Sequence, residues 1–256
     1  MKRTIIAVLA LIGAAAILAG LFLLWGVRPW RTAVLVNGHV LTARELSTRA
    51  TGMMKDAEKY DHLLIPQKRH GEARRHFERE VAQLWIFKEI MLDEAVARRL
   101  VATPAEERES LARINKQLAS RSMTADQFFK NGPLPEDLLR REFKEGVLVS
   151  KLVDAEVTSK IKLTSAEIDQ RLDDLRRISL AGLKPGQKPS ARIDRKFAID
   201  SLRNERYRAA FRDFYRAARL KATVVSPMFP GLESFGAGVL PTNGAVSASN
   251  GAAVVR

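Results

Sequence analysis

The side chains able to bind a metal ion or transfer a proton do not group into a recognisable site. The chain contains four histidines, His39, His62, His70 and His76, and no cysteine. His70 and His76 are six residues apart, a spacing that does not place two side chains on one face of a helix. We therefore expect the histidines to be surface residues and predict no metal site.

Paired acidic residues are the other candidates for catalysis, for example Glu106-Glu107 and Asp173-Asp174. Both pairs lie in strongly charged helical stretches, where solvation or helix capping explains them without general acid–base chemistry. The sequence has no glycine-rich phosphate loop, no Gly-x-Ser-x-Gly nucleophile motif and no His-Glu-x-x-His zinc motif. We expect neither an enzyme nor a bound cofactor.

Apolar side chains are better candidates for function, through binding of other polypeptides. Met53 and Met54 lie in a predicted helix, Phe128 and Phe129 precede a long one, and Phe143 lies within it. Methionine suits such a surface because its flexible, polarisable side chain adapts to varied partners. Ordinary core packing is the alternative for each residue, so we expect some members of the set to be exposed rather than any named one.

The elements that position these residues are predicted to be mainly α-helices. With 46% hydrophobic, 28% charged and 7% aromatic residues, the composition favours a helical protein over a barrel. Apolar residues recur at helical spacing, and capping boxes join Thr103 to Glu106, Thr124 to Gln127 and Thr164 to Glu167. We expect helices over approximately residues 46–57, 72–100, 104–118, 124–131, 139–157, 164–177 and 191–221.

The most specific motif follows a short aliphatic stretch near residue 35. It reads Val36-Asn37-Gly38-His39-Val40-Leu41-Thr42-Ala43-Arg44-Glu45-Leu46, a turn followed by a capped helix. Together with the segment Thr164 to Ile168, this order of signals resembles the SurA-like N-terminal chaperone domain. The same domain occurs in membrane-anchored PpiD foldases and is related to the peptide-binding part of trigger factor.

The resemblance implies a SurA-like helical peptide-binding domain over residues 32–226. In that family a late strand packs beside the first strand, so Val34–Val36 is predicted to pair with Thr223–Val225 in a short two-stranded sheet. A parvulin isomerase domain is normally inserted where residues 178–190 form a linker here. The chain has no Gly-Gly sequence and no histidine downstream of His76, so we expect neither this domain nor its activity.

The two ends of the chain have distinct compositions. Residues 4–27 are uncharged and apolar, long enough at ~1.5 Å per residue to cross a membrane, and Trp25 and Trp30 suit its interface. We predict a cytoplasmic stub and uncleaved signal anchor over residues 1–31. The alternative is a cleavable signal peptide, for which Ala16-Ile17-Leu18-Ala19 offers a small-residue site. Residues 227–256 are rich in Gly, Ala, Ser, Pro and Asn, which predicts a disordered tail.

The net charge of +14 is concentrated in residues 171–221, which contain 15 Lys or Arg and six Asp or Glu. Such a block attracts acidic partners, although a solvated helical surface explains it equally well. Binding of nucleic acid through this block is a third hypothesis, which predicts strong salt dependence. It requires access to the cytoplasm, whereas the predicted anchor places the bulk of the chain outside.

The sequence therefore predicts a single-pass inner-membrane protein with its helical domain in the periplasm. The resemblance implies a chaperone that holds unfolded or newly translocated polypeptides, near the translocon, without isomerising prolines. The alternative is an anchored helical adaptor that docks one folded partner in an envelope complex. Client identity and oligomeric state do not follow from the sequence.

Overall fold

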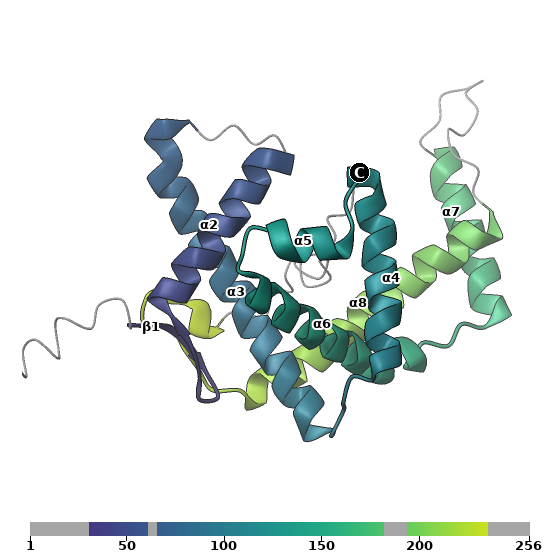
Figure 1. Cartoon of the computed structure of the whole chain (residues 1–256). Helices are drawn as coiled ribbons and strands as arrows, with labels where there is room; N and C mark the ends of the chain where they lie inside the picture. Colours follow the sequence, from purple (N-terminus) through teal and green to yellow (C-terminus); the bar gives the residue numbers. More distant parts are fainter. Residues whose placement is uncertain (1–30, 61–65, 182–193, 235–256) are drawn as a thin grey trace, which may run out of the picture. The chain divides into compact units, whose positions relative to one another are not determined.

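The computed structural model describes residues 31–60, 66–181 and 194–234 (Figure 1). Residues 1–30 of the predicted anchor, the greater part of the predicted linker and the chain beyond Ser234 lie outside the described residues. None of the helices within the described ranges combines the length and the apolar character that crossing a membrane requires.

The described residues are mainly helical with one small sheet, as predicted. The elements are β1 (Thr32–Val36), β2 (His39–Thr42), α2 (Ala43–Tyr60), α3 (His70–Ala97), α4 (Pro104–Leu118), α5 (Ala125–Asn131), α6 (Glu136–Glu156), α7 (Ser165–Ala181), α8 (Arg195–Lys221) and β3 (Val224–Val225). They form two compact units. One contains the described residues up to 86 together with residues 223–234, and the other contains the described residues between 87 and 222.

The sheet of the first unit joins segments from both ends of the described chain. Strand β1 pairs antiparallel with β3, with Leu35 opposite Val225 and Val36 opposite Val224. Asn37 extends this pairing: its backbone N–H donates to the Thr223 carbonyl at 2.9 Å, and its side-chain Oδ1 accepts from the Thr223 N–H at 2.7 Å. The predicted pairing of the two distant strands is confirmed.

The sheet has three strands, in the order β2-β1-β3, where the sequence predicted two. The additional strand, β2, pairs antiparallel with β1. Asn37 and Gly38 between them have φ angles of 48° and 94°. Positive φ at both turn residues matches the twist of a tight hairpin, so the Asn-Gly turn leads into a second strand rather than directly into a helix.

Helix α2 begins directly after β2, where Thr42 Oγ1 accepts a hydrogen bond from the Glu45 N–H at 3.2 Å. Its buried residues Leu46 and Ala50 belong to the core of the first unit. The described residues after β3 also fold: Leu232 is buried, and the Glu233 carboxylate accepts from the backbone N–H groups of Ser226 and Gly231. Residues 227–234, predicted as part of a disordered tail, are therefore ordered.

The second unit has an aromatic core built on α8. The rings of Tyr207, Phe211 and Tyr215 stack along one side of the helix, with centroids 5.7 and 6.5 Å apart. Phe87 of α3 packs against Tyr215 at 5.1 Å. Leu152 of α6 is also fully buried in this unit. Burial raises the pKa of the Tyr215 phenol to about 12, so this residue is a neutral core side chain at physiological pH.

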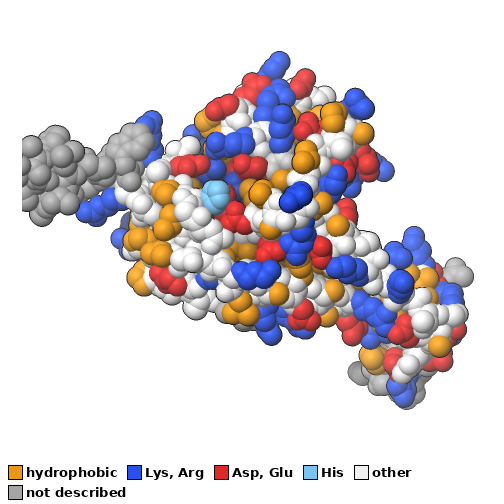
Figure 2. Space-filling model, turned by 90° about the horizontal axis from the view of Figure 1, so that it is seen from below, with side chains coloured by type: hydrophobic (Ala, Val, Ile, Leu, Met, Phe, Trp, Pro, Cys, Tyr) orange, Lys and Arg blue, Asp and Glu red, His pale blue; other side chains and the backbone are white. Residues whose placement is uncertain are grey.

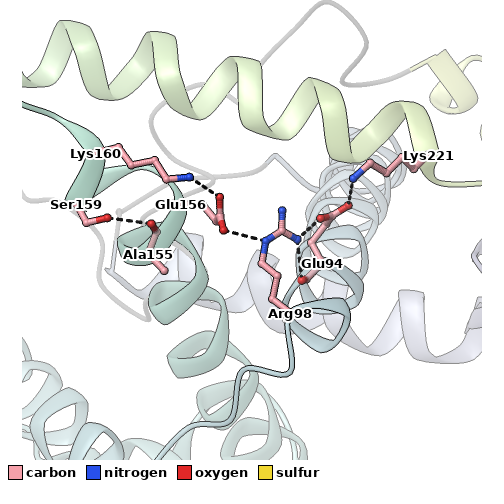
Figure 3. Close-up of polar contacts among 7 residues, drawn as sticks. All are labelled: Glu94, Arg98, Ala155, Glu156, Ser159, Lys160 and Lys221. Carbon is pink, nitrogen blue, oxygen red and sulfur yellow. Dashed lines mark hydrogen bonds and ion pairs between the residues drawn. The ribbon is translucent and has the colours of Figure 1, made fainter.

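A network of charged side chains ties the ends of α3, α6 and α8 together (Figure 3). Arg98 pairs with Glu94 and, through Nε, with Glu156 Oε1 at 3.0 Å. Lys221 Nζ reaches the Glu94 carboxylate at 3.1 Å, and Lys160 Nζ reaches Glu156 at 2.7 Å. Each carboxylate therefore lies between two cations.

The network determines the protonation of both carboxylates. Burial alone would raise the pKa of Glu94, but hydrogen bonds from Arg98 and Lys221 outweigh burial and lower it. Hydrogen bonds from Lys160 and Arg98 lower the pKa of Glu156. The guanidinium of Arg98 also lies 5.4 Å from the centroid of the Phe214 ring, within the range of a cation–π contact.

Candidate functional site

The candidate site lies where α4, α5 and α6 meet in the second unit. Thr103 and Thr124 begin α4 and α5 with the predicted capping boxes. In each box the threonine side chain accepts a hydrogen bond from the backbone N–H of the third helical residue, and the side chain of that residue accepts one from the threonine backbone N–H. Asn115 of α4 then joins the two helices, because its Oδ1 accepts from the Ala125 N–H at 2.7 Å. The start of α5 is thus held against the side of α4.

Gly132 allows α5 and α6 to approach closely. A Cβ atom at this position would lie 2.5 Å from the Phe128 carbonyl oxygen and 2.6 Å from Leu139 Cδ1. Both distances are too short for a real side chain. The glycine is therefore required by the close packing of the turn, and its φ of −70° is an ordinary one.

An apolar cluster fills the space between these three helices. Its buried centre is Ala125, Phe129 and Leu139, and partly exposed side chains surround this centre: Leu111, Ile114, Phe128, Leu134 and Phe143. The ring of Phe129 meets those of Phe128 and Phe143 edge to face, with centroids 6.0 and 5.8 Å apart. We call these eight residues the apolar cluster.

A cleft of about 660 Å³ opens beside the apolar cluster. It is lined by Leu111, Asn115, Ala119, Ser122, Met123, Thr124, Ala125 and Asp126. Leu111 and Ala125 belong to both the cleft and the cluster. The lining combines apolar surface with a few hydroxyl, amide and carboxylate groups, which is the chemistry that suits an extended peptide with an apolar side chain.

Charged groups border this site. Arg140 of α6 lies over the Phe129 ring, 4.8 Å from its centroid, and pairs with Glu136 at 2.7 Å and Asp126 at 3.3 Å. On the face drawn in Figure 2, basic side chains alternate with acidic ones and with small groups of apolar side chains. Basic side chains on this face therefore have acidic neighbours (Figure 2).

The structure brings together three of the five residues that the sequence nominated for polypeptide binding. Phe128, Phe129 and Phe143 all belong to the apolar cluster, but Phe129 is only 3% exposed and forms its buried centre. Phe128 and Phe143 are partly exposed. Met53 and Met54 lie on α2 in the first unit, and both are partly buried.

The cleft adds residues that were not nominated from the sequence, chiefly Asn115 and Met123. Leu111, which also lines the cleft, packs against the buried centre of the cluster. The hydrogen bond from the Ala125 N–H to Asn115 joins residues ten positions apart, and no local sequence pattern predicts it. Within the described ranges, no three His, Asp or Glu side chains lie close enough to hold a metal ion.

Comparison with known proteins relates the chain to one class of protein. No known protein-family profile matches it. The chain is 29% identical over 144 residues to the chaperone SurA of Chromobacterium violaceum, an alignment that covers 56% of this chain and 32% of that protein. The chain thus spans about a third of the length of this relative. The similarity suggests a SurA-like protein.

Proposed function

We propose that this protein is a chaperone that holds unfolded or newly translocated polypeptides. The observation that carries the proposal is the similarity to a SurA chaperone over 144 residues. The apolar cleft beside α4 and α5 supports it, because a holding chaperone needs apolar surface that a client can reach.

In this proposal, apolar client side chains enter the cleft and contact Leu111, Met123 and Ala125. Phe128 and Phe143 extend the contact surface along the apolar cluster. Full burial of one leucine-sized side chain contributes about 1.5–3 kcal/mol, so each contact is weak and reversible. Such binding requires no cofactor and makes or breaks no covalent bond.

The location of the protein is part of the proposal. Residues 1–31 act as an uncleaved anchor in the inner membrane, and the helical part lies in the periplasm. Tethering raises the effective concentration of the chaperone near chains that emerge from the translocon. We further propose that the protein has no prolyl isomerase activity, since its sequence has no parvulin-like glycine pair.

An aggregation assay tests this function. The full chain in detergent micelles is expected to suppress light scattering by a denatured outer-membrane protein on dilution, without accelerating isomerisation of a proline-containing peptide. Leu111→Ser should weaken suppression several-fold, because it places a hydroxyl in the cleft. Leu220→Ser is the matched control, since Leu220 is 75% exposed on α8 and does not line the cleft.

The possible outcomes separate the hypotheses. Suppression that is lost in Leu111→Ser, with an unchanged melting temperature, supports the proposal, and Met123→Ser should behave alike. Suppression that depends on Leu220 and not on Leu111 would place binding elsewhere. No suppression at all, with tight binding of one folded envelope protein, would indicate the adaptor.

A further inference from the structure

Three arginines of α7 and α8 join the two helices. Arg171, Arg195 and Arg206 each contact groups on or beside the opposite helix. Their partners are Ser201 and Glu205 for Arg171, Ser165 and Asp169 for Arg195, and Glu167 with the Lys162 carbonyl for Arg206. These arginines therefore have a structural role in joining the two helices.

Arg203 is different from these arginines. It is exposed on α8, and within the described residues it has no acidic partner. Together with Thr158, Ile161, Asn204 and Tyr207, it lines a cleft of about 450 Å³ between α8 and the end of α6. A guanidinium without an internal partner at a cleft wall is available for a ligand.

The apolar wall of this cleft is held in a fixed position. The Tyr207 ring stacks on Phe211 with an interplanar angle of 12° and a centroid distance of 5.7 Å. Burial and the nearby charge of Asp154 raise the pKa of the Tyr207 phenol, so the ring stays neutral. Ile161, which is partly buried, adds aliphatic surface.

We propose that this cleft, which we call the Arg203 cleft, binds a polypeptide segment in which a carboxylate lies next to an apolar side chain. The apolar side chain contacts Ile161 and Tyr207. The carboxylate pairs with Arg203, and the Asn204 amide and Thr158 hydroxyl are further donors.

The Arg203 cleft and the cleft beside the apolar cluster share no lining residue. It deepens the proposed function, on which it rests, by naming a class of client: chains with acidic groups beside apolar ones. The carboxylate comes either from an Asp or Glu side chain or from the C-terminus of the chain.

Fluorescence anisotropy with labelled peptides and the full chain in detergent tests the inference. One peptide pair ends in Leu with a free or an amidated C-terminus, and a second, amidated pair carries an internal Leu-Glu or Leu-Gln. At least one carboxylate peptide should bind about five-fold more tightly than its neutral twin. Arg203→Gln should remove that difference, whereas the matched control Arg208→Gln should retain it.

The pair that shows the difference identifies the source of the carboxylate. The inference is overturned if neither pair differs in affinity, or if Arg208→Gln abolishes the difference as fully as Arg203→Gln. Aggregation assays on the same variants separate this inference from the proposed function. Suppression without carboxylate preference would contradict only the Arg203 cleft, and carboxylate-dependent binding without suppression would contradict the chaperone function.

Discussion

Phe129 and Phe143 meet edge to face, with ring centroids 5.8 Å apart and an interplanar angle of 62°. One residue belongs to the seven-residue helix α5 and the other to the long helix α6. A helix this short has little stability of its own, so the aromatic contact and its neighbours hold α5 in place. The wall of the adjoining cleft depends on that docking.

Gly132→Ala is expected to loosen the docking of α5. The new methyl group would clash with the Phe128 carbonyl and Leu139, and such overpacking costs about 1–3 kcal/mol of unfolding free energy. Urea unfolding followed by circular dichroism measures the loss. Gly71→Ala is the matched control, because nothing lies within 4 Å of its Cβ position in α3, and it should be neutral or stabilising.

Tyr215→Phe is expected to increase stability. The Tyr215 side chain is fully buried, and its hydroxyl has no hydrogen-bond partner among the described residues. Removing an unsatisfied buried hydroxyl should raise the unfolding free energy by up to about 1 kcal/mol, whereas Tyr215→Ala should lower it by about 3–5 kcal/mol. A clear loss of stability in Tyr215→Phe would show that the hydroxyl has a partner.

Acid should destabilise the α7–α8 pair through Glu167. Hydrogen bonds from the backbone and side chain of Thr164, followed by that from Arg206, lower its pKa from 4.5 to about 2. A lowered folded-state pKa stabilises the fold above pH 4.5, and the contribution is lost as the pH falls toward 2. Glu167→Gln should therefore be less stable than the wild type at pH 7, and the difference should shrink by pH 2.5.

Urea midpoints at the two pH values measure this effect. Glu109→Gln serves as the control, because Glu109 is exposed on α4 and forms no ion pair within the described ranges. The urea midpoint of the control should match that of the wild type at both pH values. If the difference in urea midpoint between Glu167→Gln and the wild type stays the same at both pH values, the lowered pKa of Glu167 is contradicted.

The Arg98 network should show coupling between its members. Arg98→Met removes the contacts to Glu94, Glu156 and Phe214 and should cost about 1–2 kcal/mol, a modest value because Arg98 is partly exposed. Glu94→Gln should lower the free energy of unfolding less in the Arg98→Met background than in the wild type. Chemical denaturation of the four proteins in this double-mutant cycle tests the coupling, and additive losses would refute it.

Local sequence signals predicted much of the fold. The three capping boxes form as expected, including the contacts of Thr164 with Glu167. The pairing of β1 with β3 followed from two aliphatic segments and the resemblance to SurA-like proteins. Strand β2 was missed because it is short and partly exposed, with only Leu41 fully buried, so no clear alternation marks it.

The sequence predicted less of the candidate site. It nominated Phe128, Phe129 and Phe143, but it could not separate the buried Phe129 from its partly exposed neighbours, because that difference depends on how α5 packs on α6. The cleft depends on the Asn115–Ala125 hydrogen bond and on the close approach at Gly132, both of which are tertiary features. The defined structure of residues 227–234 likewise depends on the burial of Leu232, which composition alone does not predict.

Photo-crosslinking tests the central claim most directly. A photoreactive phenylalanine analogue replaces Leu111 in the cleft or Leu220 on the exposed surface of α8, in the full chain, and an unfolded outer-membrane protein is added before illumination. We predict strong crosslinks from position 111 that a native, folded client does not give, and few from position 220. Equal crosslinking from both positions, or none from position 111, would contradict the binding of unfolded polypeptides in this cleft.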